Sequence, residues 1–124
     1  MSKLIFLVSL ILISFNNLQA HELNPARLTL SEVEAKSFDV VWRFPSNVLT
    51  QPGSVVFPSD CKEALNSLPE VEGKYQVTTS SLVCESDLRN QELTIKGLTR
   101  MTDALISIQF FDGGQYEGLV SVNE

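Results

Sequence analysis

Apolar and polar residues alternate along several short stretches of this chain, with the two-residue period of a half-buried β-strand. The clearest stretch covers residues 38–44, where one face carries four large apolar side chains and the other carries Asp39, Val41 and Arg43. Such a face marks the hydrophobic core of a sheet. The four core-facing residues are Phe38, Val40, Trp42 and Phe44, and Trp42 is expected to pack there, with a ligand platform as the alternative.

The same reasoning predicts further strands, separated by Gly, Pro, Asn and Asp turn signals. Pro25 precedes one strand, where a missing N–H is tolerated. In the strand 104–110, Leu105 and neighbouring Phe111 oppose the apolar face, so this strand is expected to be covered on both sides. Asp112-Gly113-Gly114-Gln115 predicts a hairpin turn. The predicted strands are 26–31, 38–44, 54–57, 75–84, 92–96, 104–110 and 116–122.

One segment favours a helix. Asp60 is followed three residues later by Glu63, which is the spacing of a capping box. A brief helix is therefore predicted over residues 61–67, with Leu65 and Leu68 packed against the sheet.

Many short strands with turn signals every 8 to 12 residues or so are typical of an antiparallel β-sandwich. The sequence therefore predicts an all-β fold of about seven strands with one short helix. An immunoglobulin-like sandwich is the candidate topology, and a small closed barrel is the alternative.

The first twenty residues form an apolar leader rather than part of the fold. Lys3 supplies a positive start, residues 4–15 are almost entirely apolar, and residues 16–20 are polar or small. This is the pattern of a secretory signal peptide, with cleavage expected after Ala20. The alternative is a membrane anchor, but a span needs roughly 20 apolar residues. Residues 1–20 are therefore assigned as a signal peptide and 21–124 as one exported, periplasmic domain without a transmembrane span.

The chain is acidic, with a net charge of −6, and loss of Lys3 with the leader makes the exported domain still more negative. An acidic surface repels the phosphate backbone, so nucleic acid is not an expected partner. The acids are scattered, which is typical of a solvated surface.

Cys61 and Cys84 are the two cysteines, and both belong to the exported domain. In an oxidising compartment such a pair normally forms a disulfide. The alternatives are a metal site, which would need further Cys or His ligands nearby, and a catalytic thiol, which would need a His partner. The only His is His21, far upstream, so the disulfide is the prediction.

His21 is also the one candidate metal ligand. After cleavage it carries both a free α-amine and an imidazole, which together can chelate Ni²⁺ or Cu²⁺, and Glu22 can add an oxygen. The alternative is an exposed terminal His without a ligand. The chain contains no HExxH or CxxC motif, and no Ser/His/Asp triad can be assembled from it. No residue is therefore predicted to be catalytic.

Several segments resemble the extracytoplasmic head of HupE/UreJ-type membrane proteins. They are 21–26 directly after a signal peptide, 38–45, the Pro-x-x-Cys segment 57–61, Cys84, and the stretch from Leu93 to Val122. The resemblance implies an exported β-rich head placed before a multi-helix membrane domain and associated with nickel or cobalt. No apolar run of membrane length follows this region in the sequence, so the resemblance covers the head alone.

The sequence therefore favours a non-enzymatic, exported binding module, with a membrane protein such as a metal transporter as the expected partner. A secreted metal-binding protein using His21 is one alternative. An uncharacterised periplasmic enzyme is the other. The sequence sets no oligomeric state.

Overall fold

The structure is a computed structural model that describes residues 24–46, 53–66, 68–98 and 102–121. Its centre is a hairpin of two long strands, β1 (Ala26–Glu34) and β2 (Ser37–Pro45). The tight turn between them places Lys36 at φ 66°, in the left-handed region. Buried and solvent-facing side chains alternate along both strands, as the hydrophobic pattern predicts.

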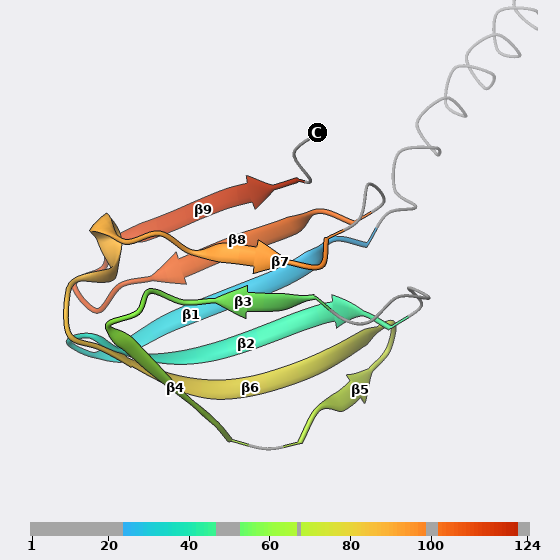
Figure 1. The fold of residues 1–124 in the computed structure, drawn as a ribbon, viewed down its shortest axis with the longest axis horizontal. Helices are drawn as coiled ribbons and strands as arrows, with labels where there is room; N and C mark the ends of the chain where they lie inside the picture. The colour runs from blue at the N-terminus through green and yellow to red at the C-terminus, as the bar shows by residue number, and fades with distance from the viewer. Residues whose placement is uncertain (1–23, 47–52, 67, 99–101, 122–124) are drawn as a thin grey trace, which may run out of the picture.

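Seven strands form one sheet around this hairpin (Figure 1). The order across the sheet is β4-β6-β2-β1-β8-β9, and β5 pairs with another length of β6. All pairs are antiparallel except β1 and β8, which run parallel, so the sheet is mixed. The added strands are β4 (Cys61–Leu65), β5 (Glu70–Glu72), β6 (Tyr75–Cys84), β8 (Ala104–Gln109) and β9 (Gln115–Val120).

A small second sheet lies over one face of the large one (Figure 1). It consists of β3 (Ser54–Val56) and β7 (Thr94–Lys96), paired antiparallel. A short 3₁₀ helix, η2 (Leu88–Asn90), precedes β7. Their partly buried side chains pack on the core that the large sheet presents, which includes Leu28, Leu30, Phe38, Val40, Trp42, Phe44, Leu82, Ile106, Ile108 and Phe110.

Trp42 lies in this core, as predicted, with 9% of its surface exposed. Its indole Nε1 donates a hydrogen bond to the carbonyl oxygen of Gly53 at 3.0 Å, which satisfies the one polar atom of the ring. Because Gly53 immediately precedes β3, this bond holds the second sheet against β2.

The predicted disulfide is present between Cys61 and Cys84. The two residues face each other directly across β4 and β6, with their Cα atoms 3.9 Å apart. Their backbone N–H groups donate elsewhere, to Pro58 and Lys36 respectively, so they form a non-hydrogen-bonded pair. Side chains are closest at pairs of this type, which suits a bridge.

The all-β prediction is confirmed, and the predicted strands are all present, but the predicted helix over residues 61–67 is wrong. Residues 61–65 form strand β4. Leu65 and Leu68 do not pack against the sheet, because they are 68% and 84% exposed. The predicted double coverage of β8 is also wrong, since Leu105 and Phe111 face solvent.

Four other points complete the comparison with the sequence. Strand β5 was not predicted, and it is only three residues long. The large sheet is open among the described residues, with β4 and β9 at its edges, so these strands do not close the alternative barrel. No helix within the described ranges is long and apolar enough to cross a membrane. The predicted leader lies outside these ranges.

Candidate functional site

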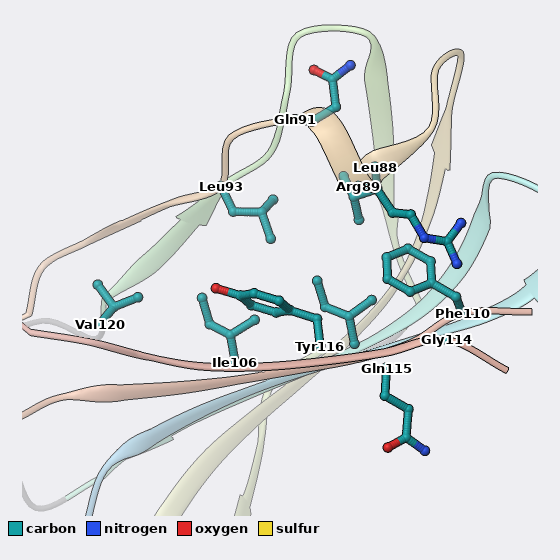
Figure 2. A pocket seen from close by; sticks show the side chains of 11 residues that line it. Leu88, Arg89, Gln91, Leu93, Ile106, Phe110, Gly114, Gln115, Tyr116 and Val120 are labelled. Atoms are coloured by element: carbon teal, nitrogen blue, oxygen red, sulfur yellow. The ribbon is translucent and has the colours of Figure 1, made fainter.

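A groove of about 540 Å³ lies between the inner face of β8 and β9 and the segment that links η2 to β7 (Figure 2). Its floor comes from alternating positions of the two paired strands, since β-strands send every second side chain to the same face. Ile106, Ile108 and Phe110 form the buried portion of this floor. Leu88 and Leu93 face them from the other side.

Tyr116 and Val120 line the groove along β9. Tyr116 is 52% exposed, so its ring is available to a ligand. The ring lies over Gly118, where an added Cβ would come within 2.6 Å of the phenolic oxygen. Gly118 therefore allows the aromatic ring to lie flat along the strand.

Arg89 closes one end of the groove. Its guanidinium lies 4.0 Å from the centre of the Phe110 ring, a cation–π contact visible in Figure 2. One nitrogen, Nη2, donates to both carboxylate oxygens of Asp112, at 2.7 and 2.8 Å, and Nη1 contacts Asp87 at 3.4 Å. Gly114 makes room for this arrangement, because a Cβ there would come within 2.8 Å of Nη2.

These contacts shift the titration of both partners. A hydrogen bond from the backbone N–H of Gly114 and the bond from Arg89 hold the pKa of Asp112 below its ordinary value. Desolvation acts to lower the pKa of Arg89, but its bonds to Asp112 and the charges of Asp112 and Asp87 outweigh this and raise it. The guanidinium is therefore a structural clamp between η2 and the β8–β9 turn, already committed to carboxylates of the same chain.

Apart from Arg89, the groove is lined by both apolar and polar side chains. The groove-lining residues contain amides and one phenol but no His, Cys or carboxylate. A pre-formed, mostly apolar concavity with a few polar groups is the usual form of a binding site.

A second, smaller recess of about 210 Å³ lies between β3 and strands β2, β4 and β6. Its carboxylate, Glu63, accepts a hydrogen bond from the buried Ser80 hydroxyl at 2.6 Å. That bond satisfies Ser80, and the recess is too small for a typical ligand. The large groove is therefore the stronger candidate.

The sequence-predicted metal ligands, His21 and Glu22, lie outside the described residues. Within the described ranges, no three His, Cys, Asp or Glu side chains gather closely enough to hold a metal ion. The groove was not predicted, because no local pattern in the sequence brings Arg89 close to the predicted strand that carries Tyr116. Asp87, which accepts a bond from the Arg89 N–H as the η2 cap, is the one local signal.

Comparisons with protein-family models, curated proteins and solved structures gave no match to this chain. The likeness to HupE/UreJ heads thus stays a prediction from the sequence.

Proposed function

We propose that this protein is a non-enzymatic, exported binding module that receives a partner in the groove between η2 and β9. The observation that carries the proposal is the groove itself: an apolar floor on β8 and β9, an exposed aromatic ring at Tyr116, and an end held by the Arg89–Asp112 clamp. A cavity that is already formed loses little conformational entropy on binding, which favours affinity.

Two further observations support export and the kind of partner. The Cys61–Cys84 disulfide is the kind of bond that persists in oxidising compartments, and it accords with the signal-peptide pattern of residues 1–20. The resemblance to HupE/UreJ heads favours a partner in the membrane, such as a metal transporter, with the module on the extracytoplasmic side.

Site-specific photo-crosslinking in the producing cells tests this proposal. A photoreactive phenylalanine analogue replaces Tyr116 in one version of the full chain and Val71 in another. Val71 is a matched control, since it is 73% exposed on β5, at the opposite edge of the sheet from β9. We expect a discrete crosslinked product, identified by mass spectrometry as a membrane protein, from position 116 alone. Equal products from both positions, or none from either, would contradict the proposal.

The enzymatic alternative has its own test. The exported protein, purified with its disulfide intact, is screened for hydrolase and oxidase activity. Turnover that disappears in Tyr116→Ala or another groove variant would replace the binding module with an enzyme. We expect no turnover above that of the buffer.

A further inference from the structure

One edge of strand β9, beside the groove, is not paired by any other described strand. Among the described strands β9 pairs only with β8, on one side. The hairpin closes with the Phe110 N–H donating to Gly114 at 2.7 Å, and bonded and non-bonded pairs alternate from there. The backbone N–H and C=O groups of the odd-numbered residues, Gln115, Glu117 and Leu119, therefore point away from the sheet. Such an edge is a ready template for another strand.

The same strand forms the rim of the groove. Its even-numbered side chains, Tyr116 and Val120, face the groove, and the Tyr116 ring lies over Gly118 between them. A strand added beside β9 would send every second side chain, at intervals of about 6.8 Å, over the apolar floor. Its other side chains would lie on the outer face of the sheet, next to Glu117. Edge and groove together thus offer both main-chain hydrogen bonds and side-chain recesses, which is how strand-adding proteins recognise peptides.

The charges near this edge select the partner's chemistry. Glu117 is exposed on the outer face of β9, and Glu92 is exposed between two groove-lining residues. At the end of the groove, the two negative charges of Asp87 and Asp112 exceed the single positive charge of Arg89. The net charge of the whole chain is −6. Cross-strand pairs of opposite charge are stabilising, so basic residues opposite Glu117 are favoured.

We propose that the free edge of β9 binds an extended segment of a partner protein by strand addition, with apolar side chains in the groove and Lys or Arg at the alternate positions. This inference rests on the proposed binding function and specifies its ligand.

A second copy of this chain fits the edge less well. Two β9 strands related by two-fold symmetry would overlap most fully with Glu117 opposite its own copy or opposite Leu119. The first arrangement places like charges together and the second leaves a carboxylate beside an apolar side chain. Both join two acidic molecules.

Synthetic octapeptides test the pattern. The first alternates valine with lysine and has capped ends, the second replaces lysine with glutamate, and the third has the composition of the first with its valines in one block. Binding to the purified exported protein is measured by fluorescence anisotropy of labelled peptides. We expect the alternating lysine peptide to bind, and the other two to bind at least about tenfold more weakly. Equal binding of all three, or no binding of the first, would overturn the proposal.

Backbone methylation then separates strand addition from simple hydrophobic contact. One peptide is N-methylated at its valines and one at its lysines. In an added strand only one of these two sets faces β9: the lysines if the strands are antiparallel, the valines if they are parallel. One methylated peptide should therefore lose binding by at least about tenfold while the other retains it. Equal effects of the two methylations would refute strand addition.

Protein variants locate the site. Tyr116→Arg adds a positive charge at the groove and should weaken binding of the lysine peptide at least about tenfold, whereas Val71→Arg on the far edge should leave binding unchanged.

Sedimentation of the protein without peptide must give monomers. Dimers that are lost on Tyr116→Arg would assign the edge to a second copy. If Tyr116 crosslinks a partner in cells but the peptides do not bind, the binding function stands and strand addition falls. If both fail, the binding function falls as well.

Discussion

Single side chains in this protein tie together turns that are far apart in the sequence. Glu32 shows this at one end of the sheet, because its carboxylate accepts from the N–H of Lys36 at 2.7 Å and of Phe111 at 2.8 Å. Arg89 does the same between η2 and Asp112. The partners of Glu32 and Arg89 could not be predicted, because only the tertiary fold brings the turns together.

The Asp112 carboxylate should make stability depend on pH in the acid range. Its pKa is lower in the folded protein than in the unfolded chain, so its contribution is present above the unfolded pKa, about 4, and disappears as pH falls through the folded pKa. We expect Asp112→Asn to lower the free energy of unfolding at about pH 7 and to lower it by less at about pH 3, which is below the unfolded pKa. Urea unfolding at both pH values measures this.

The control for this prediction is Glu92→Gln, which removes an exposed carboxylate beside the same groove. It should change stability little at either pH. The Asp112 effect should also shrink at high salt, because both partners are partly exposed and therefore screened. An Asp112→Asn effect of the same size at both pH values would show that the clamp acts without its charge.

His21 carries the metal prediction, which the described residues do not test. The chelate needs a free α-amine, so it forms only after cleavage behind Ala20. Both donor groups must lose a proton, so affinity should fall as pH drops below about 6.5. Copper should bind more tightly than nickel.

Calorimetry decides the metal prediction by comparing the mature protein with His21→Ala and with a form that carries one extra N-terminal residue. Only the unmodified mature protein should bind either metal with the chelate's pH dependence. If the three bind nickel and copper alike, His21 is an ordinary terminal residue.

Among the elements, the strongly alternating strands were predictable, whereas β4 and β5, which pair with β6, were not. In strand β2, four large apolar residues occupy every second position, so only the two-residue period of a strand fits the pattern. In β4 the spacing of Asp60 and Glu63 imitates a helix start, yet pairing with β6 and the disulfide at Cys61 hold the segment extended. Four of its five residues are exposed, so burial gave no two-residue pattern to outweigh the capping signal.

The second sheet depends on two glycines where β3 and β7 meet. Gly97 has φ +85°, and a Cβ there would come within 2.8 Å of the Gly53 Cα. Gly97→Ala therefore combines backbone strain with a clash against main-chain atoms, and we expect it to cost about 2–4 kcal/mol of unfolding free energy. Gly73→Ala is the control, because Gly73 has φ +58° but no atom within 4 Å of the added Cβ.

Backbone strain alone should lower the free energy of unfolding of the Gly73→Ala control by about 1–2 kcal/mol. Denaturant unfolding of both variants gives the comparison. A Gly97→Ala variant no less stable than Gly73→Ala would show that β3 and β7 can separate without loss, and that they are not a fixed cover of the core.

At the scale of the whole molecule, the two layers are unequal. The large sheet has seven strands. The layer that covers it consists of the second sheet, with the two short strands β3 and β7, and of η2 at one end. The cover therefore leaves the groove over β8 and β9 partly open, which no pattern within one strand could predict. The all-β class follows from the local periodicity, whereas the groove follows from how far the second layer extends.

The disulfide bears on stability and on the proposed export of the protein. Cys61 and Cys84 are 23 residues apart, and the loop between them includes β4, β5 and β6. Closing a loop of this size restricts the unfolded chain by about 3 kcal/mol in the loop-entropy model, and removal of native bridges from small secreted domains costs about 2–5 kcal/mol. Cys84→Ser and the double serine variant should both lose about that much, measured by urea unfolding. Dithiothreitol should destabilise the wild type by a similar amount and leave the double variant unchanged.

Thiol titration of unfolded, unreduced protein from the cell envelope should find no free thiol. Two free thiols there would contradict both the bridge in the cell and the export on which the proposed function depends.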